Sequence, residues 1–281
     1  MRSLDVSEVK KAVKARLSEL GTNIDPKVEE AIQIALTKET SELAKDVLQT
    51  LLDNYKIGRD KCLPICQDTG TAVFFVELGE EICLQNGSLT DALNEAVREV
   101  WQSQYYRASI LKDPLFDRIN TKDNTPAIIH TELVKGDKLT IRMALKGGGA
   151  ENMSALKMLK PSDGKEGIKA FVLNTIIQAG GNPCPPLVVG IGIGGNFETC
   201  ALLAKKALFR EFGSPHPERD WALFERELLQ SINETNIGPQ GLGGKTTALA
   251  VQIETAPCHL ASLPVAVNLN CHAHRHATIS F

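Results

Sequence analysis

Residues 63–70 read Leu-Pro-Ile-Cys-Gln-Asp-Thr-Gly, and four adjacent side chains in this segment could take part in chemistry. Cys66 carries a thiol, Gln67 an amide, Asp68 a carboxylate and Thr69 a hydroxyl. A proline and a glycine frame these residues, so a plain turn around a buried cysteine explains the segment equally well. Loops on a rigid scaffold often carry function, and the segment is therefore a candidate site that depends on residues further along the chain.

Two further cysteines lie in comparable surroundings, because each also borders a strand-like run. Cys184 lies in Asn-Pro-Cys-Pro-Pro, where three prolines stiffen the chain and would fix the direction of the sulfur. Cys271 opens the run Cys-His-Ala-His-Arg-His. Three thiolates from separate loops, with Cys66 as the third, can hold a four-iron cluster and leave one iron open. An open iron is a Lewis acid that can bind a substrate oxygen and activate water.

The remaining cysteines and histidines allow other interpretations of this part of the chemistry. The chain has seven cysteines, an odd number, and no secretory signal, so we do not expect a disulfide framework. Cys83 and Cys200 lie within expected regular elements beside apolar neighbours and resemble core residues, whereas Cys62 and Cys258 are intermediate. The three histidines after Cys271 could bind zinc, but ligands so close together rarely surround one tetrahedral ion. A polar rim at the end of a strand is the simpler alternative.

Two more segments offer groups that bind anions. Arg107 follows an expected helix, where a solvated charge or a partner for the helix dipole is the ordinary interpretation and anion binding the alternative. Glycines 147–149 leave backbone N–H groups bare, which suits close approach of a carboxylate or cofactor, although a flexible turn has the same composition.

Two glycine-rich stretches imitate nucleotide-binding motifs. Residues 190–195 match G-x-G-x-x-G between a strand-like run and a helix, so a dinucleotide-dependent oxidoreductase is a competing hypothesis. However, the first two glycines lie inside the run, and no clear strand ending in Asp or Glu follows about 20 residues later. Residues 238–247 resemble a phosphate-binding loop, but Pro239 occupies the position of the first glycine and no evident helix follows. We therefore do not expect ATP binding.

Apolar periodicity predicts the elements that must position these residues. Helices are expected over residues 5–20, from Asp25-Pro26, from Ser41, over 88–106 and 165–179, from near Asn196, and over 221–232. Strands are expected over residues 72–78, 81–84, 126–134, 138–145, 187–195, 248–253 and 263–269. The strands at 126–134 and 138–145 flank Lys-Gly-Asp and should form a hairpin. These elements predict an α/β fold with a helical N-terminal part followed by mixed β-sheets flanked by helices.

Composition limits the classes of function. The 281 residues carry a net charge of −3, which argues against nucleic-acid binding, because phosphate contacts require clustered Lys and Arg. No apolar run approaches the ~20 residues that span a bilayer, and no signal peptide is evident. We expect a soluble cytoplasmic protein with one domain over residues 1–281, in which residues 1–60 are a candidate helical subdomain.

Four motifs together resemble one enzyme family. They are CQDTG at 66–70, KGGGAEN at 146–152, the Cys-Pro-Pro at 184–186 and the ending PCHLASLPVAVNLNCHAHRH. In this order they are similar to the alpha subunit of class I, iron-sulfur fumarate hydratases, and the resemblance covers the chain from about residue 40. The same module is the N-terminal half of single-chain class I fumarases and the alpha subunit of L(+)-tartrate dehydratase.

The resemblance implies a set of functional residues. Cys66, Cys184 and Cys271 would bind a [4Fe-4S] cluster, while Gln67, Arg107 and Gly149 would face a C4 dicarboxylate substrate. Asp68 and His259 would form a proton-handling pair, since imidazole titrates near neutral pH and a carboxylate can orient it. Arg107 would offer a planar fork to a carboxylate.

The implied reaction is reversible addition of water to fumarate, giving L-malate, as in the tricarboxylic acid cycle. In single-chain relatives the opposite-face base and further arginines belong to a C-terminal domain. We therefore expect the isolated chain to be inactive until a beta subunit completes the site, in a higher oligomer such as an alpha2beta2 assembly. Tartrate dehydratase is the nearest alternative, followed by the oxidoreductase and by a non-catalytic zinc or scaffold protein.

Overall fold

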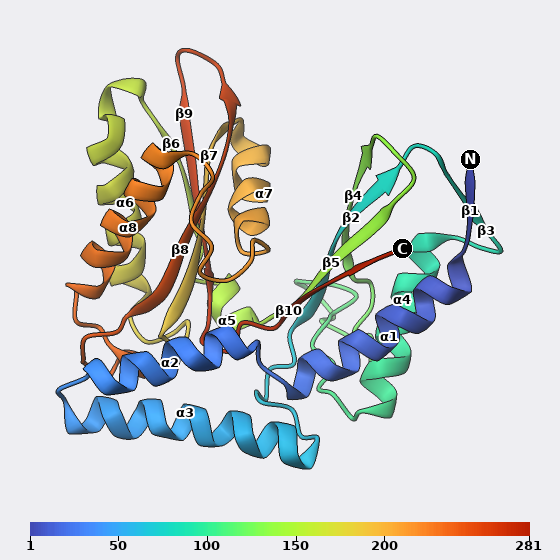
Figure 1. Cartoon of the computed structure of the whole chain (residues 1–281), viewed down its shortest axis with the longest axis horizontal. Helices are drawn as coiled ribbons and strands as arrows, with labels where there is room; N and C mark the ends of the chain where they lie inside the picture. The colour runs from blue at the N-terminus through green and yellow to red at the C-terminus, as the bar shows by residue number, and fades with distance from the viewer. The chain divides into compact units, whose positions relative to one another are not determined.

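The computed structural model describes residues 1–281 and divides them into two compact units (Figure 1). The first unit consists of Met1–Ile24, Tyr55–Gly148 and Arg275–Phe281, and the second of Asp25–Asn54 and Gly149–His274. The N-terminal helices are thus shared between the units. The organisation as one domain, with a helical subdomain at residues 1–60, stays a prediction.

Three N-terminal helices form where the apolar spacing predicts them. They are α1 (Val6–Thr22), α2 (Pro26–Lys38) and α3 (Glu42–Lys61). The α1 stripe of Val9, Val13 and Leu17 is fully buried, as its spacing of four residues requires. Asp25 caps α2 by accepting a hydrogen bond from the backbone N–H of Lys27, and proline occupies the first turn.

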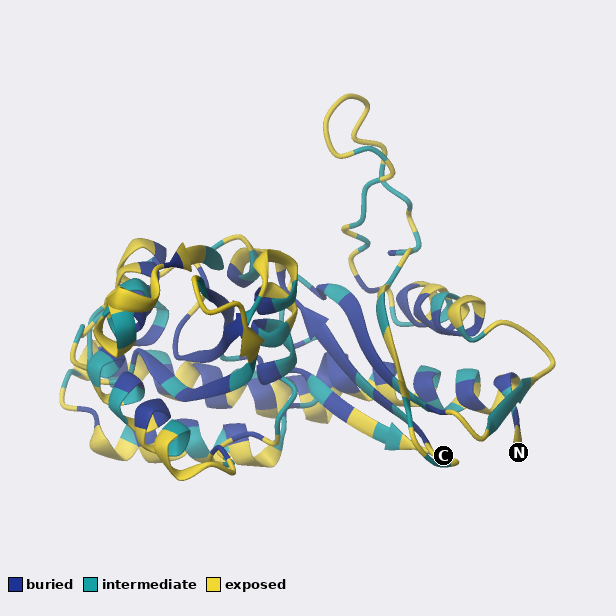
Figure 2. Cartoon of the chain, turned by 90° about the horizontal axis from the view of Figure 1, so that it is seen from above, coloured by how far each residue is buried: buried dark blue, intermediate teal, exposed yellow.

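The first unit is a sheet covered by two helices. Its four strands run in the order β10, β5, β2, β4, while β1 and β3 form a separate parallel pair. The core between the sheet and helices α1 and α4 contains Trp101, Phe74 and Met143. Figure 2 shows the buried residues gathered in the strands and on the inner sides of the helices. The bounds are β1 Arg2–Asp5, β2 Thr71–Gly79, β3 Ile82–Gln85, α4 Leu89–Ser103, β4 Ile128–Val134, β5 Leu139–Lys146 and β10 His276–Ser280.

The predicted hairpin between the strands near 126–134 and 138–145 is wrong. Both strands exist, but β2 lies between them, pairing in parallel with β4 and antiparallel with β5. The physical reason is burial: Ala72 to Val76 in β2 are all buried and take the centre, whereas most of β4 is exposed or half-buried and suits an edge.

Helix α4 ends earlier than predicted, at Ser103 instead of residue 106. Tyr105 has a positive φ of 53°, so the chain has already left the helical conformation there. Tyr106 then turns inward, donates a hydrogen bond to the Ser18 carbonyl at 2.9 Å and packs edge-on against Trp101. This tertiary contact outweighs the local helix propensity of the last residues.

The second unit has three layers, with its sheet between helices on both faces (Figure 1). The strand order is β6, β9, β7, β8, in which β7 pairs in parallel with β8 and antiparallel with β9. Helices α6 and α8 share the main apolar core with β7, β8 and β9, and α7 packs on the other face. The bounds are α5 Gly148–Glu151, β6 Ala155–Leu159, η1 Pro161–Asp163, α6 Gly164–Ala179, β7 Leu187–Gly195, α7 Phe197–Ala207, α8 Arg219–Asn233, η2 Pro239–Gly241, β8 Ala248–Cys258 and β9 Leu263–Asn270. None of the helices combines the length and apolar character needed to cross a membrane.

The glycines of β7 serve helix packing. A Cβ atom at Gly190 would lie 2.2 Å from the Ala204 carbonyl oxygen, and one at Gly192 would lie 2.1 Å from the Cys200 carbonyl oxygen. Both carbonyls belong to α7, so the bare strand allows the helix backbone to approach closely. This contact explains the G-x-G spacing without a nucleotide.

Residues 238–247, the second glycine-rich loop, form hydrogen bonds within the loop and with Glu39. The N–H of Gly238 donates to the Thr247 hydroxyl oxygen at 3.1 Å, and the N–H of Lys245 donates to Glu39 Oε2 at 2.7 Å. Glu39 is only 4% exposed. Burial raises the pKa of Glu39, but hydrogen bonds from the N–H groups of Ser41, Lys245 and Thr40 outweigh it and hold the pKa below its ordinary value. The loop is therefore built around an ionised carboxylate.

We predict that Glu39→Gln destabilises the chain by about 1–3 kcal/mol at neutral pH, because an amide cannot accept all three hydrogen bonds. Since the folded-state pKa is lowered, the stability from Glu39 is present above its unfolded pKa of about 4.3 and is lost as pH falls through the folded value. The difference in denaturant midpoint between wild type and variant should therefore shrink below about pH 4. The exposed Glu42→Gln is the control, and an equal effect of both changes would contradict the prediction.

Candidate functional site

The Cys66 loop follows α3 and is anchored through the residues after the cysteine. Cys66 is half-buried and Gln67 is exposed. Thr69 is 2% exposed and donates its hydroxyl hydrogen to the Arg107 carbonyl at 3.0 Å. Asn124, which is fully buried, donates to the Gly70 carbonyl at 3.0 Å. The structure therefore places the backbone of Arg107 beside the segment that contains Cys66, Gln67 and Asp68.

Asp68 is held by backbone groups on both carboxylate oxygens. Its Oδ1 accepts from the N–H of Gly70 at 2.9 Å, and its Oδ2 accepts from the N–H of Gly148 at 2.7 Å. Two charge-assisted hydrogen bonds fix the carboxylate plane, and a carboxylate has about four lone-pair positions, so acceptor capacity remains. Asp68 is half-buried, so part of its side chain remains accessible to a bound molecule.

Arg107 contributes an exposed side chain to the same unit. Its backbone carbonyl accepts from Thr69 and from the indole N–H of Trp101, at 3.0 and 3.3 Å. Its backbone is therefore fixed beside the Cys66 loop while the guanidinium faces solvent. An exposed planar fork on a fixed backbone can bind a carboxylate.

Cys184 and Cys271 lie in segments that meet at one end of the two inner strands of the second unit's sheet. The N–H of His272 donates to the Cys184 carbonyl at 3.3 Å. Strand β7 begins three residues after Cys184, and β9 ends one residue before Cys271, with Val188 opposite Asn270 in the ladder. The antiparallel register therefore places the start of one strand beside the end of the other.

The backbone around Cys184 is unusual for a residue with a side chain. Cys184 has a φ of 58°, in the left-handed region that such residues rarely adopt and that is enriched at functional sites. Its side chain is exposed, whereas Cys271 is 9% exposed. The exposed Gly149 joins this group, because a Cβ there would lie 3.4 Å from the Asn182 carbonyl oxygen.

His259 lies at the other end of the same sheet. It follows β8, whose last residue, Cys258, pairs with Gly195 at the far end of β7. Strand β9 has eight residues, so about 26 Å of extended chain separates the His259 turn from Cys271. The second unit therefore does not bring His259 together with Cys184 and Cys271, and its catalytic role stays a prediction.

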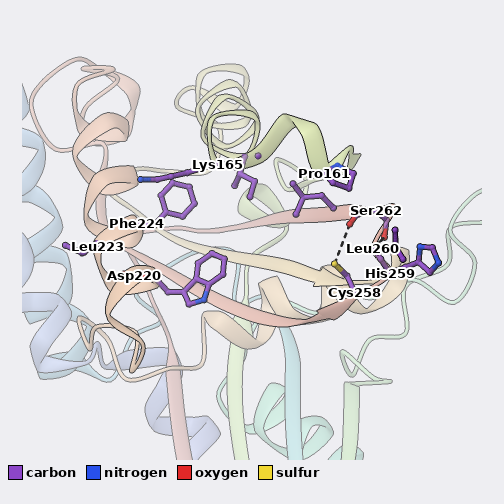
Figure 3. Close-up of a pocket in the computed structure, with 13 residues that line it drawn as sticks. Pro161, Lys165, Asp220, Leu223, Phe224, Cys258, His259, Leu260 and Ser262 are labelled. Carbon is purple, nitrogen blue, oxygen red and sulfur yellow. Dashed lines mark hydrogen bonds between the residues drawn. The ribbon is translucent and has the colours of Figure 1, made fainter.

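His259 instead lines a pocket of about 660 Å³ formed with α6, α8 and the turn between β8 and β9. Figure 3 shows His259 beside Cys258 and Leu260 at one end of this pocket, with Phe224 at the other. The exposed imidazole accepts a hydrogen bond at Nδ1 from the N–H of Ala261 at 3.2 Å. Most of the pocket lining is apolar, and its titratable side chains are those of His259, Lys165, Asp220 and Cys258.

The other cysteines separate by burial. Cys200 lies in α7 and is fully buried, and burial raises the pKa of its thiol, which disfavours the thiolate needed for metal binding. The prediction that Cys200 belongs to the core is confirmed. Cys83 is only half-buried in the short strand β3, so its assignment to the core is wrong. Cys62 and Cys258 are exposed.

Sequence reasoning missed two residues that hold the Cys66 loop. Asn124 bonds Gly70, and the buried Arg275 donates from Nη2 to the Asp68 carbonyl at 3.0 Å. Both contacts join segments more than 50 residues apart, so local patterns could not reveal them. The only available signal was the position of Arg275 within the histidine-rich run.

We predict that Gly70→Ala destabilises the chain by about 3 kcal/mol, measured by chemical denaturation. Gly70 has a φ of 82°, and a Cβ there would lie 2.9 Å from the Lys146 backbone. Gly213 is the matched control because its φ is 75° but no atom lies within 4 Å of the added Cβ, so Gly213→Ala should cost only about 1 kcal/mol. Equal losses of unfolding free energy in the two variants would contradict the role of the close approach between Gly70 and the Lys146 backbone.

Comparisons with known proteins identify the family of the chain. The family described as "Fumarate hydratase (Fumerase)" matches residues 10–280. A Methanocaldococcus jannaschii protein provisionally named L(+)-tartrate dehydratase subunit alpha is 44% identical over 257 residues, covering 89% of each chain. The L(+)-tartrate dehydratase subunit alpha of Escherichia coli K12 is 37% identical over 245 residues, covering 86% of this chain and 80% of that protein. The chain therefore belongs to the fumarate hydratase (Fumerase) family.

Proposed function

We propose that the chain is the alpha subunit of a [4Fe-4S] hydro-lyase that catalyses reversible hydration of fumarate to L-malate, with a separate beta subunit completing its active site. Family membership over residues 10–280 supports the hydro-lyase class. The observation that carries the proposal is the junction of Cys184 and Cys271 by the hydrogen bond from His272 to the Cys184 carbonyl.

The donor set fits an iron-sulfur cluster. Soft thiolates are the preferred ligands of such clusters, and Cys184 and Cys271 would supply two of them from the same end of the sheet. We propose Cys66, the half-buried cysteine of the first unit, as the third ligand. Three protein ligands would leave one iron open to substrate.

The chain's own residues would bind and orient the substrate. The exposed guanidinium of Arg107 would bind one carboxylate of the C4 dicarboxylate, and Gln67 would hydrogen-bond its polar groups. Gly149 would allow a carboxylate to approach the bare backbone. When bound, the cluster supplies a Lewis acid that assists cleavage of the C–O bond.

Asp68 is the proposed proton carrier of this chain. The N–H groups of Gly70 and Gly148 fix its carboxylate, so a proton can move to or from a defined oxygen position. We retain His259 as a proposed catalytic residue on the resemblance alone, because the second unit places it at the far end of the sheet from Cys271.

L(+)-tartrate dehydratase is the second candidate, and the names of the relatives favour it. Tartrate is also a C4 dicarboxylate and differs from malate by an additional hydroxyl group. The groups proposed for Arg107, Gly149 and Asp68 suit both substrates. The choice between them therefore depends on a donor or acceptor for the second hydroxyl.

The relatives are named as alpha subunits, which supports a beta subunit as the partner of this chain. We further propose a cytoplasmic enzyme that assembles as an alpha2beta2 or similar oligomer.

We predict that the full chain, reconstituted anaerobically with iron and sulfide, holds one [4Fe-4S] cluster. Cys66→Ser, Cys184→Ser and Cys271→Ser should each lose labile iron and sulfide, because serine replaces a soft thiolate ligand. Iron and sulfide analysis with visible absorption measures the loss.

Cys62→Ser and Cys258→Ser are the matched controls, since both cysteines are exposed and lie outside the proposed ligand set. If the controls lose the cluster while the three proposed ligands can be replaced without loss, the ligand assignment is wrong. Tight zinc with no labile iron would support the non-catalytic zinc alternative instead.

We also predict that the reconstituted chain alone has no measurable turnover and that adding the beta subunit restores it. Anaerobic assays with fumarate, L-malate and L(+)-tartrate should be compared on the same assembled preparation. A higher kcat/KM for malate supports the fumarate hydratase proposal, and a higher kcat/KM for tartrate supports the second candidate. Turnover by the chain alone would contradict the requirement for a partner.

A further inference from the structure

The connection between α4 and β4 forms a projecting arm in the first unit. It runs from Gln104 to Ala127 without a helix or strand of its own. Connections longer than about 12–15 residues without regular elements are uncommon, and they usually have a function. Residues 109–125, which we call the arm, extend away from the sheet and helices of their unit (Figure 2). The arm is therefore a feature that packing of the core does not require.

Hydrogen bonds between its two sides hold the arm in shape. The N–H of Lys112 donates to the Ile119 carbonyl at 2.8 Å, and the N–H of Thr121 donates to the Ile110 carbonyl at 2.9 Å. The two sides thus run antiparallel as a short ribbon. A segment that is already ordered loses less conformational entropy when it binds, so the arm is suited to recognition.

The tip of the arm is apolar and fixed. Leu115, Phe116 and Ile119 are 69%, 83% and 54% exposed. Asp113 fixes the turn, because its Oδ1 accepts from the N–H of Leu115 at 2.8 Å and from the N–H of Phe116 at 2.5 Å. Single exposed apolar residues are ordinary, but three of them within five positions of an ordered tip indicate an interaction surface.

The charges of the arm limit the kind of partner. Three basic and three acidic side chains balance one another: Lys112, Arg118 and Lys122 against Asp113, Asp117 and Asp123. Nucleic acids and anionic membranes select an excess of Lys and Arg, and a dicarboxylate would also need a cationic surface. An apolar tip surrounded by balanced charge instead fits a protein surface with an apolar groove and a polar rim.

The base of the arm is tied to the proposed substrate-binding segment. The N–H of Ser109 donates to Asn124 Oδ1 at 2.8 Å, and Asn124 Nδ2 donates to the Gly70 carbonyl at 3.0 Å. Arg107, which directly precedes the arm, accepts from the Thr69 hydroxyl through its carbonyl. The arm therefore leaves the first unit beside the residues for which we propose substrate binding. A beta subunit that completes this site must lie beside the same residues.

We propose that the arm is a docking element for the beta subunit, and that Leu115, Phe116 and Ile119 insert into an apolar groove of that subunit. This inference rests on the proposed function, because it requires a beta subunit. A few buried anchors carry most of the binding free energy of an interface, and aromatic residues are enriched among them. Phe116 is therefore the expected main anchor.

The first experiment measures the Kd between the anaerobically reconstituted full chain and the beta subunit by isothermal titration calorimetry. Phe116→Ser should weaken binding about 10- to 100-fold. Phe197→Ser is the matched control, because Phe197 is 67% exposed in α7 of the second unit, and it should leave the Kd unchanged. Equal weakening by both variants would overturn the inference.

Thermal unfolding of the isolated full chains tests the fold of these variants. Both should melt at the wild-type temperature, since substitutions of exposed side chains have little effect on stability. A lower melting temperature for Phe116→Ser alone would show that the ring packs against its own chain, and this result would overturn the inference.

The second experiment identifies the partner directly. Phe116 is replaced by the photoreactive benzoylphenylalanine, and the assembled preparation is irradiated. Position 116 should cross-link to the beta subunit, whereas the same replacement at Phe197 should not. Cross-links from position 116 only to a second copy of this chain would overturn the inference in favour of self-association.

The outcomes separate this inference from the proposed function. If wild type and Phe116→Ser bind the beta subunit equally well, the inference is wrong and the proposed function stands. If wild type does not bind the beta subunit, the proposed partner and the inference both fail. If Phe116→Ser assembles normally and only raises the KM for malate or tartrate, the arm acts on the substrate and the inference is overturned.

Discussion

The hydrogen bond from the His272 N–H to the Cys184 carbonyl is the constraint on which the candidate site of the second unit depends. It joins the segment before β7 to the segment after β9, and the antiparallel pairing of these strands makes it possible. The glycines of β7 contribute indirectly, because they let α7 pack on the sheet that sets this register. Two cysteines 87 positions apart in the sequence thus become neighbours through main-chain geometry.

In the first unit, hydrogen bonds of the Asp68 residue hold the Cys66 loop in place. Asp68 accepts from two backbone N–H groups through its side chain, and its own carbonyl accepts from Arg275. The loop is therefore held from within and from the two neighbouring segments. Preorganisation of this kind suits the role of proton carrier that we propose for Asp68.

The side chains of neighbouring residues predicted where helices and strands lie better than they predicted which strands pair. The stripe of α1, the proline at the start of α2 and the start of α7 near Asn196 follow from the side chains nearby, and all are present. The neighbours of β4 could not be predicted, because alternation of apolar residues reports burial and not which strand lies alongside. The cysteine loops were recognised from their residues, whereas the position of His259 relative to Cys271 depends on strand direction, and Arg275 depends on contacts across more than 200 positions.

The pairing of β10 with β5 also has a consequence for synthesis on the ribosome. Strand β10 covers one edge of the first sheet, yet it is translated after every other strand of both units. Until then the edge of β5 is open, and an open edge can pair with other nascent chains. A chain in which β10 has not yet paired would therefore expose this edge of the sheet in the first unit.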